Sequence, residues 1–370
     1  MVKEKAVLVY YGIGFLLILT GFAVKGNLKI GEESLSRRKK ACYLAAAFGI
    51  MLFFSAMRDV SVGTDTKHYL QIYEWLNQSD TFGRYEPGFA LLNIFVGRYL
   101  GDFQWVIVLS SIIMIVPYAI YIYKESEDVV FSTIIFFFYY FISFSTMMRQ
   151  GMAMGIVMLA LLCYKRKKRL LFILLVLLAS TFHSSAWFAL IIPIFSKLRY
   201  SFISFVLCAG SAYLLGRLNF FRDLMSNLEF DSSYIGEAGA GGTNALMLSC
   251  ITLAMLATFY WVGGSSDTGH VQIIDFRKFE SYNFEILMTI LYTVFQITTI
   301  SIPVMARVSD YYSAGFLTLV PNKLARDANG REKLIVYTVL ILIFCIYQYI
   351  VFIYRPLWGG FVPYSFFWQA

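Results

Sequence analysis

The chain has 370 residues, of which 59% are hydrophobic and 18% aromatic, and a formal net charge of +8. This composition excludes a water-soluble globular protein. Apolar runs long enough to cross a hydrocarbon core recur along the whole length, which predicts an all-α, polytopic membrane protein with residues 1–370 in a single integral membrane domain. Most of the positive charge lies in short loops between these runs, where it indicates topology and not nucleic-acid binding.

Roughly twelve apolar runs are predicted to span the membrane. In chain order they are 6–24, 41–57, 103–123, 129–145, 147–164, 170–181, 184–195, 201–215, 244–262, 282–304, 308–320 and 334–354. The runs on either side of His183 are short, which predicts a break in the helix there. The run Pro87–Leu100 is interrupted by glycines, Asn93 and Arg98, as expected of a re-entrant or interfacial helix. The five cysteines lie inside apolar runs without metal-binding spacing, so we expect small buried side chains.

Three short loops are rich in lysine and arginine, and the positive-inside rule places them in the cytoplasm. They are residues 27–40, 165–169 and 321–333. If Pro87–Leu100 does not cross the membrane, all three loops fall on one side. The outer side then receives the N-terminus, Arg58–Leu100, the junctions at Arg149 and His183, the loop Arg217–Gly242, Arg307 and the C-terminus.

Four cationic or titratable side chains lie within or at the ends of apolar runs: Arg58, Arg149, His183 and Arg307. Charge at membrane depth is costly, so such residues usually face a cavity, a partner or an anionic ligand. We expect all four to converge on one anionic substrate at the outer face. Structural explanations stay open for each alone, since Arg149 could extend to the interface, His183 could be a satisfied buried histidine, and Arg307 could pair with Asp310.

Two external segments add acidic candidates. The sequence Gly63–Thr66 is typical of a turn that leads into an amphipathic helix, with Thr64 or Asp65 as its cap. Glu86 precedes Pro87 at the start of an apolar helix, where a carboxylate either complements the helix dipole or acts as a general base. The sequence contains no metal-ligand spacing, Walker A motif or Rossmann glycine fingerprint, so we expect no metal and no cofactor.

Taken in order, these segments resemble the EpsG family of exopolysaccharide proteins, which is related in role to the Wzy-type polymerases. The matching pieces are Arg58 through Gly63-Thr64-Asp65-Thr66 to Tyr69, then Tyr85–Phe89, Arg149-Gln150, Phe182–Ala186, and Arg307 with Tyr311. The resemblance implies a fold like that of the C-type glycosyltransferases. It also implies a multi-pass enzyme of the bacterial cytoplasmic membrane that joins undecaprenyl-diphosphate-linked oligosaccharide repeat units into exopolysaccharide or capsule at the outer leaflet.

The partners that the resemblance implies are the lipid-linked donor and acceptor and membrane lipid, with a flippase and a chain-length regulator as candidates and no nucleic acid. The expected transfer is metal-independent, because the sequence has few acidic metal motifs. It needs no nucleotide sugar or external energy source, because the diphosphate bond supplies the driving force. The arginines expected to bind the leaving diphosphate are Arg58, Arg149 and Arg307. The acceptor hydroxyl needs a base, and the candidates are Glu86, Asp65 and His183. Glu86 is preferred because it lies at the water boundary.

Two other functions stay open. One is an intramembrane acyltransferase, such as a glycan O-acetylase, with His183 as general base. Its acyl donor would be cytoplasmic, whereas the loop charges place His183 outside. The other is a flippase of lipid-linked oligosaccharides, which is expected to show repeats and cations distributed across the depth of a cavity. A shared external depth of the four charged residues favours the polymerase.

Overall fold

A computed structural model describes residues 2–25, 35–79, 81–198, 202–217, 242–262, 282–299, 302–354 and 359–369. Across these ranges the secondary structure is helical, apart from one isolated antiparallel bridge between Arg58 and Phe366. The predicted all-α class is therefore confirmed for this part of the chain. Most of the predicted loop Arg217–Gly242, residues 218–241, lies outside the described residues.

The chain divides into two compact units. Unit 1 comprises Met1–Trp187 and Tyr337–Ala370, and unit 2 comprises Phe188–Val336. Two such units can belong to one membrane domain, so the single domain stays a prediction.

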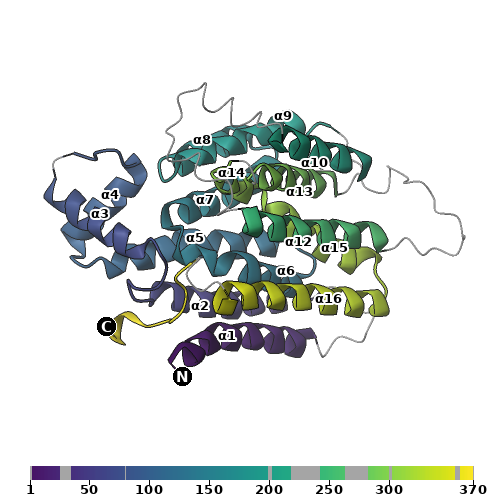
Figure 1. The fold of residues 1–370 in the computed structure, drawn as a ribbon, viewed down its shortest axis with the longest axis horizontal. Helices are drawn as coiled ribbons and strands as arrows, with labels where there is room; N and C mark the ends of the chain where they lie inside the picture. Colours follow the sequence, from purple (N-terminus) through teal and green to yellow (C-terminus); the bar gives the residue numbers. More distant parts are fainter. Residues whose placement is uncertain are drawn as a thin grey trace, which may run out of the picture. The chain divides into compact units, whose positions relative to one another are not determined.

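Unit 1 is built on helices that run side by side, with α3 and α4 at one end together with the C-terminal segment (Figure 1). Its helices are α1 (Val2–Lys25), α2 (Arg37–Ala56), α3 (Thr66–Gln78), α4 (Pro87–Tyr99), α5 (Gln104–Glu125), α6 (Val129–Phe136), α7 (Met148–Lys165), α8 (Arg169–Ser180) and most of α16 (Gly330–Tyr349). Short elements follow several of them: the π-helices Phe137–Phe141 and Ile350–Tyr354, and the 3₁₀ helices Ser143–Ser145 and Phe367–Gln369. The longer 3₁₀ helix Ser184–Ile191 begins in unit 1 and ends in unit 2.

Small residues allow α7 to approach α5 closely. A Cβ added to Gly155 would overlap the carbonyl oxygen of Ile113, and one added to Gly151 would press on the Met114 sulfur. Glycines four residues apart are a common means of bringing two membrane helices into backbone contact. This contact fixes the first turn of α7, which carries Arg149.

Unit 2 is organised around α13 (Asn283–Thr298), which packs against α10 (Phe202–Arg217), α12 (Gly242–Trp261) and α15 (Ala314–Asp327). The short helices α9 (Ile192–Phe195) and α14 (Met305–Ser309) and the 3₁₀ turn Asp310–Tyr312 also belong to it. One buried cluster of its core consists of Leu256, Phe259, Tyr282, Ile286, Ile290 and Leu319.

Three helices of the described chain are long and apolar enough to cross a membrane: Arg37–Ala56, Gln104–Glu125 and Gly330–Tyr354. Other predicted spans are shorter or broken. The run 129–145 contains the π-helix Phe137–Phe141, and the run 308–320 is divided by the turn Asp310–Tyr312. The architecture fits a membrane protein, whereas the number of twelve spans stays a prediction.

One local prediction is confirmed, and a second agrees with the length of a helix. Helix α8 ends at Ser180 and a 3₁₀ helix begins at Ser184, so the chain breaks at His183. Helix α4 has 13 residues, which corresponds to about 20 Å and is too short to cross a hydrocarbon core. This length agrees with the prediction that Pro87–Leu100 does not span.

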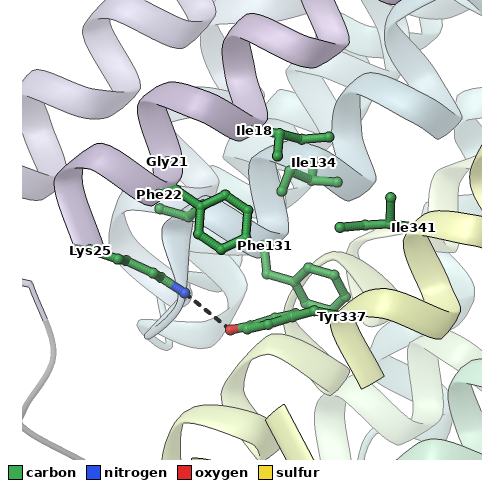
Figure 2. Close-up of a pocket in the computed structure, with 9 residues that line it drawn as sticks. Ile18, Gly21, Phe22, Lys25, Phe131, Ile134, Tyr337 and Ile341 are labelled. Carbon is green, nitrogen blue, oxygen red and sulfur yellow. Dashed lines mark hydrogen bonds between the residues drawn. The ribbon is translucent and has the colours of Figure 1, made fainter. Parts of the chain in front are cut away.

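One end of unit 1 collects ion pairs from the borders of the predicted cytoplasmic loops. Lys25 lies 2.6 Å from Asp128, and Lys165 lies 2.6 Å from Glu125. Lys25 also donates a 3.1 Å hydrogen bond to the Tyr337 hydroxyl, at the edge of a cavity of about 40 Å³ (Figure 2). The apolar lining residues are Ile18, Phe22, Val130, Phe131, Ile134 and Ile341. These contacts bring the ends of α1, α5, α6 and α7 and the first half of α16 to one end, as the loop charges require.

The prediction of buried cysteines is wrong. Cys42 and Cys250 are exposed, and Cys163, Cys208 and Cys345 are only partly covered. An apolar membrane helix turns one face to lipid, so an apolar run does not by itself place a side chain in the protein core.

Candidate functional site

The site begins at a close contact between α4 and the end of α8. The carbonyl oxygen of Thr181 accepts hydrogen bonds from the backbone N–H groups of Gly88, at 2.8 Å, and Phe89, at 3.3 Å. These N–H groups belong to the first turn of α4, which has no partners within its own helix. A Cβ at Gly88 would overlap the Thr181 hydroxyl, so glycine permits the approach. The contact places Glu86 beside His183.

The carboxylate of Glu86 bridges two side chains from other elements. Glu86 is the N-cap residue of α4, and its side chain makes no capping hydrogen bond. Its Oε2 accepts a 2.7 Å hydrogen bond from Arg149 Nη1, and its Oε1 lies 3.3 Å from His183 Nδ1. Three residues from separate predicted motifs are thus in direct contact, in a cluster that we call the Glu86 cluster.

Arg149 is held against aromatic rings as well as by the carboxylate. Its guanidinium carbon lies 5.9 Å from the Tyr69 ring centroid and 5.8 Å from that of Phe89. These two rings contact each other edge to face at 5.7 Å. Aromatic faces attract a guanidinium and fix its plane. The Nε atom of Arg149 is buried and has no hydrogen-bond partner among the described residues.

The electrostatics of Glu86 favour its ionised form. Burial raises the pKa of Glu86, but the hydrogen bond from His183 and the positive charge of Arg149 together lower it by more than burial raises it. The pKa is therefore lowered to about 2. A carboxylate of such low pKa binds a proton weakly. Since it accepts from His183 Nδ1, it holds the imidazole in the tautomer whose Nε2 is the proton acceptor.

Arg58 lies in unit 1 but does not contact the Glu86 cluster. Its side chain is 0% exposed, and its Nη1 donates to the Ser55 carbonyl oxygen and lies 3.4 Å from the Ser111 hydroxyl. Its Nε and Nη2 atoms have no partner within the described ranges. The prediction that Arg58 binds the donor diphosphate stays a prediction.

The remaining candidates lie elsewhere. Asp65 is the N-cap residue of α3, as predicted, but its side chain makes no capping bond and accepts instead from the Thr64 hydroxyl at 3.1 Å. Arg307 is an exposed residue of α14 in unit 2. Convergence of Arg307 with the Glu86 cluster stays a prediction.

Sequence reasoning did not predict the contacts that surround Arg149 and His183, although Thr66, Tyr69 and Phe89 lie in the matching segments. Tyr69 and Thr66 are one turn apart on the buried face of α3, a spacing that predicts burial but no contact with Arg149. The Thr181 carbonyl is a backbone group that no residue pattern identifies. The segment 359–369 carries no motif, yet it binds the loop that contains Arg58.

Comparison with models of protein families identifies a match. The model of the EpsG family matches residues 41–366, a range that includes every residue of the Glu86 cluster. Searches of curated proteins and of solved structures found no match.

Proposed function

The chain belongs to the EpsG family, and on this basis we propose that it is a membrane glycosyltransferase that polymerises lipid-diphosphate-linked oligosaccharide repeat units. The observation that carries the proposal is the Glu86 cluster, in which a carboxylate joins an arginine and a histidine at the end of unit 1 opposite the ion pairs of Lys25 and Lys165. The loop charges assign this end to the outer face of the cytoplasmic membrane. The substrates would be undecaprenyl diphosphate carriers, and the product exopolysaccharide or capsule.

The reaction breaks one bond and forms another at the same carbon. The bond between the anomeric carbon of the donor sugar and the diphosphate oxygen is cleaved, and the acceptor hydroxyl oxygen bonds to that carbon. The hydroxyl proton passes to a base, and the lipid diphosphate leaves as an anion. The enzyme must therefore supply a proton acceptor and a cation next to the leaving group.

In this chain we assign the proton acceptor to His183. Glu86 binds Nδ1 of the imidazole, and Nε2 makes no hydrogen bond to any residue that the structure describes. The low pKa of Glu86 makes its carboxylate a poor base, so its role is to orient the histidine and to neutralise the imidazolium that forms. We therefore assign the base to His183 and not to Glu86, which the sequence analysis favoured.

Arg149 is the proposed ligand of the leaving diphosphate. It contacts Glu86 through Nη1 and its side chain is 26% exposed, so an anion can approach the guanidinium without breaking that contact. A guanidinium binds phosphate oxygens in a fork that lysine cannot reproduce. Arg307 is proposed as a second diphosphate ligand. Arg58 and Asp65 remain candidates for binding and for proton transfer.

The test is synthesis by the purified protein in detergent or nanodiscs, supplied with a lipid-linked repeat unit and analysed on a gel for a ladder of products. His183→Ala and Arg149→Lys are expected to lower ladder formation by about 100-fold or more. His68→Ala and Arg98→Lys are the matched controls, because both residues are exposed and lie outside the cluster, on α3 and α4. Wild-type yield from His183→Ala and Arg149→Lys would refute the assignment.

The same assay separates the alternatives. A flippase would give no ladder with any variant, although the purified protein would still transfer lipid-linked units between leaflets of a vesicle. An acyltransferase would leave the repeat unit unpolymerised and require an acyl donor.

A further inference from the structure

The C-terminal segment 359–369 is bound along the loop 57–66 by backbone hydrogen bonds. The N–H groups of Gly63 and Thr64 donate to the carbonyl oxygens of Gly360, at 2.9 Å, and Gly359, at 3.1 Å. Further along, the Asp59 N–H donates to Ser365 at 2.9 Å, and the Phe367 N–H donates to Met57 at 3.1 Å. The two segments are about three hundred residues apart in sequence, so this pairing is a feature of the tertiary fold.

Side chains fasten the same segment to α1 and to the end of α2. The Tyr364 hydroxyl donates to the Phe54 carbonyl oxygen at 2.8 Å, and the Tyr10 hydroxyl donates to that of Phe361 at 3.1 Å. Phe361 is buried. The segment is therefore part of the folded body of unit 1 and not a free tail.

The loop in turn contacts the chain that precedes Arg149. The Thr66 hydroxyl donates to Val62 at 2.7 Å and lies 3.2 Å from the carbonyl oxygen of Ser145, four residues before Arg149. Gly63 has a φ of 93°, and a Cβ there would overlap the same Ser145 oxygen. One turn after Thr66, Tyr69 lies against the guanidinium of Arg149. A shift of the loop would therefore move both the start of α7 and the ring beneath Arg149.

Arg58 is buried under this pairing. It forms the bridge with Phe366, and its Nε and Nη2 atoms are shielded from water without a described hydrogen-bond partner. Shielding donors in this way is unfavourable, so the contacts of the segment must outweigh that cost. Proteins that retain an unfavourable feature, such as buried donors without partners, usually do so at functional sites.

We propose that residues 359–369 are a positioning element of the active site, which stays docked during turnover and fixes the loop 57–66 so that Tyr69 and the start of α7 hold Arg149 in place. The inference rests on the proposed function for its activity readout, whereas the docking itself is tested without substrate. It assigns a role in the proposed reaction to a part of the chain that carries no catalytic side chain.

The first experiment locks the segment in place. The hydroxyl oxygens of Ser61 and Ser365 lie 3.3 Å apart, so the pair Ser61→Cys and Ser365→Cys is placed for a disulfide. The five native cysteines are first replaced by serine or alanine in the full-length protein. Oxidation is expected to form the disulfide without substrate, as seen by mass spectrometry of the digested protein. Ladder formation by the oxidised protein should stay within about twofold of the reduced protein, because the lock preserves the geometry that holds Arg149.

Failure to form the disulfide would show that the segment is not docked and would overturn the proposal. Loss of activity on oxidation, restored by a reductant, would overturn it too, because the segment would then have to leave during turnover. If the cysteine-free parent forms no ladder, the proposed polymerase function fails, while disulfide formation still reports on docking.

The second experiment disturbs the docking locally. Gly360 has a φ of 60°, and a Cβ there would lie 3.2 Å from the Thr64 nitrogen, so Gly360→Val pushes the segment off the loop. Ladder formation is expected to fall about 100-fold, as displacements of about 1 Å do in other active sites, and the Ser61→Cys and Ser365→Cys lock should restore most of it. Gly101→Val is the matched control, with a φ of 74° and no atom within 4 Å of its added Cβ. Unchanged activity of Gly360→Val would contradict the proposed role.

Discussion

The ion pair of Glu86 makes the stability of the protein depend on pH in a way that can be worked out. The pKa of Glu86 is lowered from 4.5 to about 2 in the folded protein. A lowered folded-state pKa contributes stability above the unfolded value, and this contribution is lost as the pH falls from about 4.5 towards about 2. The full shift corresponds to about 3 kcal/mol, which the partial exposure of the pair to solvent reduces to about 2 kcal/mol.

The perturbation is Glu86→Gln, which removes the charge and keeps the shape. Between about pH 5 and pH 3 the wild-type protein should lose about 1 kcal/mol of this contribution, and the variant should not. The assay is the apparent melting temperature in detergent across this pH range, read as the difference between wild type and variant so that other titrating groups cancel. Asp65→Asn is the control, because Asp65 is exposed and accepts only from Thr64. Identical pH profiles for wild type and Glu86→Gln would refute the ion-pair reasoning.

Three further outcomes are expected. Gly88→Ala should lower the melting temperature by an amount equivalent to about 1–3 kcal/mol, because the added Cβ would overlap Thr181. The control Gly49→Ala on α2 meets no atom within 4 Å and should change the melting temperature little, so equal effects of the two variants would contradict the α4–α8 contact. Arg149→Lys should insert normally and bind the lipid-linked donor more weakly in a pull-down, because lysine lacks the guanidinium fork; unchanged binding would remove Arg149 from the donor site. A single cysteine at Lys67 should be labelled by a membrane-impermeant maleimide from outside intact cells and one at Lys167 should not; labelling of both would overturn the topology.

Much of the local structure around the site follows from the sequence. The proline at position 87 begins α4, the turn Gly63–Thr66 leads into α3, and the break at His183 lies where the apolar runs became short. Each of these depends on dihedral preferences and apolar spacing within a few residues, which a sequence displays directly.

The sequence does not show in the same way which side chains of the site contact each other. Glu86 meets His183 because Gly88 packs on the Thr181 carbonyl, a contact between segments about ninety residues apart that leaves no periodic signal. Arg58 follows an apolar run much as Arg149 precedes one, yet its side chain turns inward to Ser55 and Ser111. The direction in which each arginine side chain points depends on the packing of neighbouring helices and on the segment 359–369, which carries no motif.

The lengths of the helices differ from those of the predicted spans for a related reason. Residues 137–141 form a π-helix in an apolar run that was predicted as one span, and every aromatic side chain in it is buried. Apolar composition predicts an environment without water, but it does not distinguish lipid from the interior of a helical bundle. Composition alone therefore does not determine how many of the apolar runs span the membrane.

The most direct test of the central claim, that the Glu86 cluster catalyses glycosyl transfer, is the release of free lipid diphosphate by the purified protein during elongation. Mass spectrometry of the lipid fraction would be compared with the number of repeat units in the polymer, for wild type and His183→Ala. We expect one lipid diphosphate for each unit added by the wild-type protein, and neither release nor elongation above background by His183→Ala. Elongation by His183→Ala at the wild-type rate, or intact lipid-linked units with no release by the wild type, would contradict the claim.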